Sequence, residues 1–281
     1  MATSTPPTDS DPGRRADVAV ACLVIDNLAS AAETFPAAVL VDGLDRLLAE
    51  LTRPIEEQGG SVDHFCGDTL VALFGPDEAD GTPVADPLLR ACRAAQAQQA
   101  VLPALNEGLS DRLGWPVELS LRGGLAGGPA VSGPLASLPA QRRVVLGDVA
   151  RLAPRLDAAN RIYGTRLLAA GPRLAAAANG LALREIDHVV LRGQTDAISL
   201  FELAPPTLER GRWQRLCDAY AQALRAYRAR DFEPAWKLFD HCLGLVPDDR
   251  PTQVLMQRLD LFVLEPPAPD WDGAWHLTDL A

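Results

Sequence analysis

One uninterrupted apolar run does most to limit the folds open to this chain. Residues 18–25 read VAVACLVI, which is the length of a strand, and Asp26 ends the run abruptly. An apolar run without alternation suits a strand that is covered on both faces. The sequence therefore predicts a layered fold with this strand inside its sheet.

The segments that follow predict the layers around this strand. Apolar residues recur every three or four positions over 36–57, which predicts a helix. Residues 61–75 indicate two short strands joined at Cys66-Gly67-Asp68. Further elements are expected as a helix over 84–107, a strand over 117–125 that breaks at Gly127-Gly128-Pro129, a strand over 142–147, a helix over 148–160 capped by Asp148, a strand over 167–171 and a hairpin over 184–203. This order predicts an α+β fold, a ferredoxin-like βαββαβ sandwich with helices on one face of a mostly antiparallel sheet.

Changes in composition divide the chain into three parts. Residues 1–16 are rich in Pro, Ser, Thr and Asp without periodicity, which predicts a disordered tail. Ala204-Pro205-Pro206 predicts a boundary, so we expect one domain over 17–204 and an all-α segment over 205–281.

The all-α segment has the pattern of a tetratricopeptide-like hairpin. Helices are expected over 208–229, 232–245 and 251–262, with Ala235, Phe239 and Pro247 at the offsets of a repeat's second helix. One such hairpin cannot bury its apolar face alone, so it should dock on the first domain or on a partner. We expect the tail with Trp271 and Trp275 to be pinned into a groove of its own domain.

Charge and composition exclude several classes of protein. The net charge is −11 and the pI about 4.8, and an acidic surface repels the phosphate backbone of nucleic acids. The cysteines are scattered and form no CxxC, which is typical of a reducing compartment. No apolar run is long enough for a bilayer, and the first residues lack the apolar core of a secretory signal. We therefore expect a cytoplasmic protein that binds neither nucleic acid nor membrane.

Two carboxylates are expected at one edge of the sheet. Asp26 ends the first strand and Asp68 lies at the tip of the next hairpin. If these strands are neighbours, the two carboxylates repel each other and favour a shared cation, for which oxygen ligands suit Mg²⁺ or Mn²⁺. The alternative is that Asp68 only forms a turn and Asp26 only caps a helix.

Four segments, in order and over about 17–203, resemble the catalytic domain of class III nucleotidyl cyclases. GGSVDHFCGDTLVALFG at 59–75 is similar to the family's GG-x-VDKFIGD-x-x-MAVFG, and LGDVARLAPRLDAANRIYG at 146–164 to its IGDTVNLAARLE. LSLRGGLAGGPAVSGPLAS at 119–137 and REIDHVVLRGQTDAISLFEL at 184–203 resemble its glycine-rich strand pair and its closing hairpin.

The resemblance implies an activity and a set of site residues. Such a cyclase converts a nucleoside triphosphate to a 3′,5′-cyclic nucleotide and pyrophosphate, in sites formed between two subunits paired head to tail. It implies two metal ions, Mg²⁺ or Mn²⁺, on Asp26 and Asp68, and phosphates on the backbone at Asn27 and Leu28. Arg155 matches the family's arginine that stabilises charge in the transition state.

Several positions depart from the family pattern. His64 replaces the base-reading lysine, Val144 its hydrogen-bonding companion and Arg151 the asparagine that orients the ribose, while Arg192 matches a basic residue that could bind triphosphate. The alternative is that these residues bind no ligand: His64, Arg151 and Arg192 would then be solvated surface residues, and Val144 would belong to the core. Three hypotheses stay open. The first is an active cyclase homodimer, whose substrate is expected to be ATP because ATP is the most common substrate in the family. The others are a pseudo-cyclase that acts as a regulatory or binding module, and the metal-supplying half of a heterodimer.

Overall fold

The computed structural model describes residues 14–75, 86–115, 118–134 and 143–277. Its strands form one mixed sheet in the order β2-β3-β1-β4-β6-β8-β7-β9, and β5 pairs with β4. The strands are β1 (Arg14–Asp26), β2 (Ser61–Cys66), β3 (Thr69–Phe74), β4 (Ser120–Pro134), β5 (Arg143–Leu146), β6 (Leu167–Ala170), β7 (Leu183–Leu191), β8 (Ile198–Leu203) and β9 (Trp275–Leu277). The long central strand β1 lies between β3 and β4, which confirms its place inside the sheet.

The helices cover both faces of this sheet, so the expectation of helices on one face was wrong. They are α1 (Leu28–Thr34), α2 (Ala37–Glu57), α3 (Pro87–Leu113), α4 (Asp148–Tyr163), α5 (Leu174–Leu181), α6 (Arg210–Arg228), α7 (Phe232–Leu245) and α8 (Arg250–Leu264). Along β1, Ala21 and Leu23 face the core shared with α2 and α3, whereas Val20 and Cys22 face the core shared with α4. Because β1 is apolar on both sides, both faces must be covered.

The glycines of β4 do not break the strand, in contrast to the sequence prediction. Strand β4 runs without interruption from Ser120 to Pro134. A Cβ atom on Gly124 would lie 2.1 Å from the carbonyl oxygen of Ala153 in α4, and one on Gly127 2.6 Å from Cβ of Leu88 in α3. These glycines therefore allow helices to pack closely on both faces of β4, and they form no turn.

Three further details differ from the expectation. Strand β1 begins at Arg14 and pairs with β4 from there, so the last residues of the predicted tail belong to the sheet. The cap of α4 is Gly147, and Asp148 is its first helical residue. Helices α1 and α5 were not predicted, because both are short and follow loop-like sequence.

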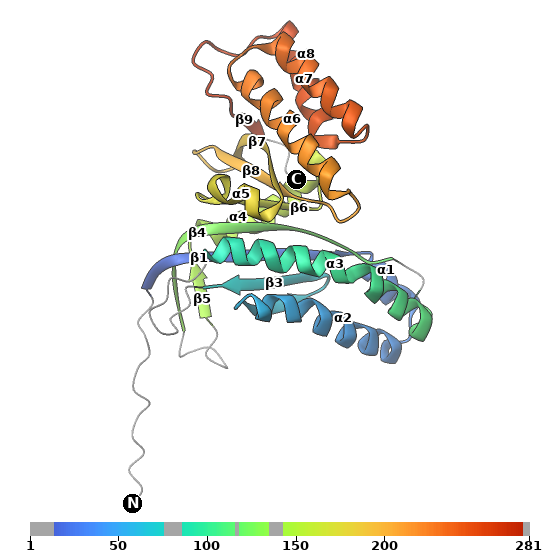
Figure 1. Ribbon diagram of the computed structural model, residues 1–281. Coiled ribbons are helices and arrows are strands. Elements are labelled where there is room, and N and C mark those ends of the chain that lie inside the picture. The colour runs from blue at the N-terminus through green and yellow to red at the C-terminus, as the bar shows by residue number, and fades with distance from the viewer. Residues whose placement is uncertain (1–13, 76–85, 116–117, 135–142, 278–281) are drawn as a thin grey trace, which may run out of the picture.

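The C-terminal helices dock on the sheet, as expected for a hairpin that cannot bury its apolar face alone. Figure 1 shows α6, α7 and α8 together at the β7 end of the sheet. Their buried residues share one core with α4 and β7, so the boundary at 204 separates two kinds of structure but not two cores. In the tail, the ring centroid of Trp271 lies 5.3 Å from that of Tyr227, and β9 pairs with β7.

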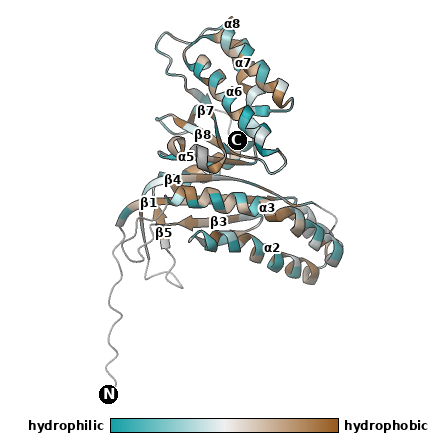
Figure 2. Ribbon diagram, viewed as in Figure 1, coloured by the Kyte–Doolittle hydropathy of each residue, from teal (hydrophilic) through white to brown (hydrophobic). Residues whose placement is uncertain are grey.

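Hydropathy follows this layering. In Figure 2 strand β3 is largely brown, whereas α2, α3 and α6 alternate between brown and teal, as expected of helices with one buried face. Every helix in the described ranges is too short or too polar to cross a bilayer.

Candidate functional site

Asp26 and Asp68 lie at the same end of two neighbouring strands. Asp26 is the last residue of β1, and Asp68 lies in the turn before β3. The antiparallel register places Val24 opposite Thr69, and the N–H of Ile25 donates to the carbonyl oxygen of Asp68 at 2.9 Å. The pairing of β1 with β3 therefore brings Asp26 and Asp68 to one edge of the sheet, as predicted from their positions at adjoining strand ends.

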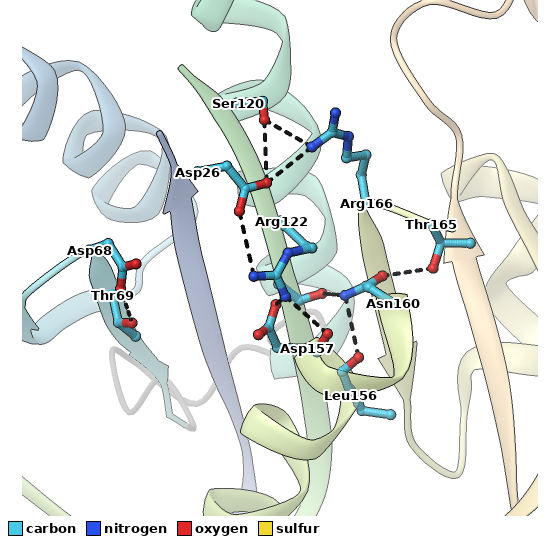
Figure 3. Close-up of polar contacts among 11 residues, drawn as sticks. Asp26, Asp68, Thr69, Ser120, Arg122, Leu156, Asp157, Asn160, Thr165 and Arg166 are labelled. Atoms are coloured by element: carbon cyan, nitrogen blue, oxygen red, sulfur yellow. Dashed lines mark hydrogen bonds and ion pairs between the residues drawn. The ribbon is translucent and has the colours of Figure 1, made fainter. Parts of the chain in front are cut away.

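Each of the two carboxylates already has hydrogen-bond donors. On Asp26, Oδ2 accepts from Arg166 Nη1 at 3.1 Å and from Ser120 Oγ at 3.4 Å, and Oδ1 accepts from Arg122 Nη2 at 3.5 Å. The carboxylate of Asp68 accepts from the hydroxyl of Thr69 at 3.0 Å. Figure 3 shows the Asp26 carboxylate directed toward the two arginines and the Asp68 carboxylate toward Thr69.

Arg122 links Asp26 to helix α4. Its Nη1 donates to Oδ1 of Asp157 at 2.5 Å and to the carbonyl oxygen of Asp157 at 3.2 Å, and its side chain is only 12% exposed. Burial raises the pKa of the Asp157 carboxyl above its ordinary value, and the Arg122 charge opposes that shift. Asn160, one turn further along α4, fixes the same helix to β4 by donating to the carbonyl oxygen of Gly123 at 2.9 Å (Figure 3).

The sequence prediction missed Arg122, Asp157 and Arg166. One signal was available for Arg122, which is the only charged residue between Leu119 and Val131. Arg166 carried no such signal, because it lies 140 residues from Asp26 along the chain. Only the pairing of distant strands brings it to the carboxylate.

The donor chemistry at this edge fits a hard divalent cation. Mg²⁺ is usually held by one or two carboxylates together with water and substrate phosphates, and Asp26 and Asp68 are the carboxylates at this edge that could hold it. A cation on Asp26 competes with the two guanidinium groups that now neutralise that carboxylate. Among the described residues, no group of three or more His, Cys, Asp or Glu side chains is arranged to hold a metal ion.

His64 and Val144, predicted to face the nucleotide base, line one hollow. The hollow has a volume of about 680 Å³ and lies on the α4 face of β1 and β3. Its other lining residues are Val20, Cys22, Val24, Asp63, Thr69, Val71, Leu73, Val145, Ala150, Pro154 and Asp157. This volume is in the range of small-molecule sites. The walls are mainly apolar, and His64 Nδ1 already lies 2.7 Å from an oxygen of Asp63.

The three predicted arginines lie in two different environments. Arg151 is exposed and pairs with Asp148 one turn earlier, at 2.5 Å. Arg155 is half-buried, and its guanidinium lies against Gly193 in the β7–β8 turn, next to the exposed Arg192. The fold therefore gathers Arg155 and Arg192 at one turn and leaves Arg151 facing outward.

The segment after Asp26 is fixed by its own contacts. Asn27 has a positive φ of 69°, and its side-chain amide donates to the carbonyl oxygen of Glu118 at 2.9 Å. The Leu28 side chain is only 4% exposed and packs in the core, so it is unavailable to a ligand. The backbone N–H groups of Asn27 and Leu28, at the start of α1, are the phosphate donors that this segment offers.

Comparisons with known proteins identify the fold and show which sequences this chain is similar to. No family model matches the chain. The "Adenylate cyclase, terminal-differentiation specific" of Dictyostelium discoideum is 25% identical over 225 residues, which are 78% of this chain and 10% of that protein. "Adenylate cyclase 1" of Rhizobium meliloti is 29% identical over 144 residues, 51% of this chain and 21% of that protein. The crystal structure of the adenylyl cyclase CyaB from P. aeruginosa superposes with a TM-score of 0.59 at 18% identity, covering 70% of this chain and 97% of that one.

The sequence is similar to those of adenylate cyclases, and the fold is shared with crystal structures of an adenylyl cyclase and a guanylyl cyclase. This fold agrees with the resemblance seen in the sequence motifs. The chain spans only about a tenth and a fifth of the length of the two curated relatives. The roles of the individual site residues stay predictions of the motif alignment.

Proposed function

We propose that this chain is a nucleotidyl cyclase, which converts a nucleoside triphosphate to a 3′,5′-cyclic nucleotide and pyrophosphate. The observation that carries the proposal is the edge formed by Asp26 and Asp68 in a cyclase fold, with Arg122 and Arg166 beside it. Two carboxylates and two guanidinium groups at one edge suit a metal-bound triphosphate. An intracellular site of action, where nucleoside triphosphates and Mg²⁺ are supplied, completes the proposal.

Two divalent ions, Mg²⁺ or Mn²⁺, are the cofactors in this proposal, with Asp26 and Asp68 as their carboxylate ligands. When bound, such ions polarise phosphate oxygens and activate the ribose 3′-hydroxyl. Once the Asp26 carboxylate binds a metal ion, Arg122 and Arg166 are free to neutralise phosphate charge. The backbone at Asn27 and Leu28 donates to phosphate oxygens.

The remaining site residues come from the second subunit of a head-to-tail homodimer in this proposal. Arg155 stabilises the charge that develops at the α-phosphate, Arg192 contacts the triphosphate and Arg151 faces the ribose. The exposure of Arg151 and Arg192 in one subunit leaves both available to contact a partner. ATP is the expected substrate, because it is the most common substrate in the family. His64 and Val144 would contact its adenine base.

A second candidate function is a pseudo-cyclase or the metal-supplying half of a heterodimer. Two observations favour it: Arg151 pairs with Asp148, and Val144 offers no hydrogen bond to a base. In this alternative the chain keeps the carboxylate edge and acts through binding or dimerisation.

A cyclisation assay separates these functions. The purified chain is incubated with Mn²⁺ and each of ATP, GTP, CTP and UTP, with EDTA as the metal-free control. Metal-dependent cyclic nucleotide is expected from the chain alone. Nucleotide binding without turnover would identify the pseudo-cyclase, and turnover only after mixing with a second cyclase chain would identify the heterodimer half.

A further inference from the structure

A buried polar cluster joins the C-terminal helices to the end of α4. Arg258 of α8 donates from Nη1 to Oδ2 of Asp187 in β7 at 2.5 Å, and from Nη2 to the phenol oxygen of Tyr163 at 3.0 Å. The Tyr163 hydroxyl donates to the same Asp187 carboxylate. Tyr163 and Asp187 are fully buried, and Arg258 is 4% exposed. The cluster therefore ties together α8, β7 and the last residue of α4.

Each side chain of the cluster has at least two partners. The other oxygen of Asp187 accepts from the backbone N–H of His188 at 2.7 Å, and the Arg258 guanidinium lies 4.5 Å from the ring centroid of Trp275. Burial raises the pKa of Tyr163 well above its ordinary value, so its phenol stays protonated and donates. A buried hydrogen-bonded network of this kind favours one arrangement of the elements that it joins.

A second buried cluster fixes the N-terminal end of α8. Asp249, the N-cap of α8, accepts from both terminal nitrogens of Arg184 in β7, at 3.0 and 2.8 Å. Arg184 also pairs with Glu202 of β8. Beside this cluster, the α4 cap residue Gly164 has a φ of +63° and lies against Arg250. Helix α8 is therefore held on β7 at its N-cap and again near its middle, and the end of α4 lies beside it.

The elements held in this way carry the predicted arginines of the site. Arg155 lies two turns before Tyr163 on α4, and β7 leads directly into the turn at Arg192 and Gly193 that contacts Arg155. A buried ion pair is weak evidence for stability, because desolvation offsets much of its attraction, and fixing the register of an element is its better-supported use. A helix that carries a catalytic side chain must hold that side chain in a fixed position relative to the substrate.

We propose that the C-terminal helices position α4 for catalysis, with Arg258 as the positioning residue, acting through Asp187 and Tyr163. This inference rests on the proposed cyclase function. Rotation or axial movement of α4 displaces Arg155 relative to the nucleotide, and a displacement of about 1 Å costs on the order of 100-fold in rate.

Three variants isolate the cluster from general stability. Tyr163→Phe removes one hydroxyl and keeps the ring. Arg258→Met combined with Asp187→Leu replaces the buried pair by apolar side chains of similar size, an exchange that proteins often tolerate without loss of stability. The matched control is Arg228→Met, because Arg228 pairs at 2.8 Å with Glu185 and so also links the C-terminal helices to β7, without contacting α4.

The readouts are kcat and KM of the full chain with Mn²⁺ and ATP, and hydrogen exchange of the α4 amides. We expect the cluster variants to lower kcat by about 10- to 100-fold with KM changed less than about twofold, and to speed exchange in 151–155. Arg258→Lys, which keeps the charge, should recover part of kcat, and the control should match the wild type. Cluster variants that match the control in kcat and exchange would overturn the inference.

The two proposals fail in different ways. If the wild type produces no cyclic nucleotide, the proposed function fails, and exchange at 151–155 still decides the inference. Faster exchange there in Tyr163→Phe than in Arg228→Met, at an equal melting temperature, supports positioning by the cluster. Equal exchange in the two variants overturns it.

Discussion

Arg122 determines the charge around the candidate metal edge. Its guanidinium lies between Asp26 of β1 and Asp157 of α4 and contacts both carboxylates. With Arg166 also on Asp26, the edge carries two cationic groups. Among the described residues, the Asp68 carboxylate accepts from the Thr69 hydroxyl and pairs with no guanidinium group, so in the proposed site it is the more available ligand for a cation (Figure 3).

Replacement of Asp68 tests this edge. Asp68→Asn keeps the side-chain shape and the turn preference but removes the charge that holds a cation. We expect metal-dependent turnover to fall by at least about 100-fold, with an unchanged melting temperature. Asp240→Asn, an exposed aspartate of α7, is the matched control. Full activity in Asp68→Asn would show that this aspartate only forms the turn.

Base selectivity is the second prediction at the residue scale. The hollow offers an apolar surface at Val144 and a histidine at His64 that already has a partner. Apolar pockets discriminate by about 10- to 200-fold, so the kcat/KM values of the wild type for ATP and GTP should differ by no more than that.

The double variant His64→Lys with Val144→Asp should raise the preference for ATP, because it supplies a hydrogen-bonding pair for the base. The measurement is kcat/KM for each triphosphate, with Asp240→Asn again as the control. A wild-type preference for ATP above about 1000-fold would contradict the assignment of both positions.

At the scale of elements, strand β4 determines how closely the helices pack. Gly124 faces α4 and Gly127 faces α3, and both approach the helices more closely than any Cβ atom allows. Asn160 then fixes α4 to β4 through its hydrogen bond to Gly123. The position of the arginines on α4 therefore depends on residues of β4 that have no polar side chain.

Gly124→Ala should therefore destabilise the protein. The new methyl group meets the Ala153 carbonyl oxygen at 2.1 Å and the Asp157 backbone nitrogen at 2.7 Å, and backbone atoms cannot move aside as a flexible side chain can. We expect a loss of about 1–3 kcal/mol in the free energy of unfolding, measured by urea denaturation.

Gly108→Ala is the control for this variant. Gly108 lies in α3 with nothing within 4 Å of the added methyl group. It should be neutral or stabilise by up to about 1 kcal/mol, because alanine favours a helix over glycine. Equal stability of the two variants would mean that α4 can move away from β4 at little cost.

At the scale of the whole molecule, a single core crosses the boundary predicted at residue 204. Buried residues of α6, α7 and α8 belong to the same cluster as those of β1, α4 and β7. Arg184 and Asp187 of β7 find their charged partners, Asp249 and Arg258, on α8. The C-terminal helices therefore complete the fold of the cyclase-like part.

Truncation after residue 204 tests this dependence. It exposes the apolar face of β7 and leaves Asp187 without its guanidinium partner, and breaking one such buried pair costs about 3–5 kcal/mol. We expect residues 1–204 to show no cooperative unfolding transition, by circular dichroism during heating, whereas the full chain shows one. A cooperative transition of the fragment at the midpoint of the full chain would make the two parts independent.

Self-association is the second prediction for the whole molecule. The proposed site needs Arg155 of one subunit and Asp26 of the other, so light scattering at rising concentration with Mn²⁺ and nucleotide should show a dimer. Arg155→Ala should lower turnover and leave the dimer intact. A monomer at all concentrations would favour the heterodimer hypothesis.

The sequence alone determined those features that depend on the pattern of residues within a short segment. The apolar run at 18–25 predicted a buried strand that ends at Asp26, and the segment 61–75 predicted a hairpin with Asp68 at its tip, since both follow from spacing along a short segment. Tertiary structure decided what depends on distant partners: Arg166 on Asp26, Arg258 on Asp187, and glycines that admit helices where the sequence indicated a break. Side chains far apart in the chain meet only after the sheet has formed, and no local periodicity records which of them will be neighbours.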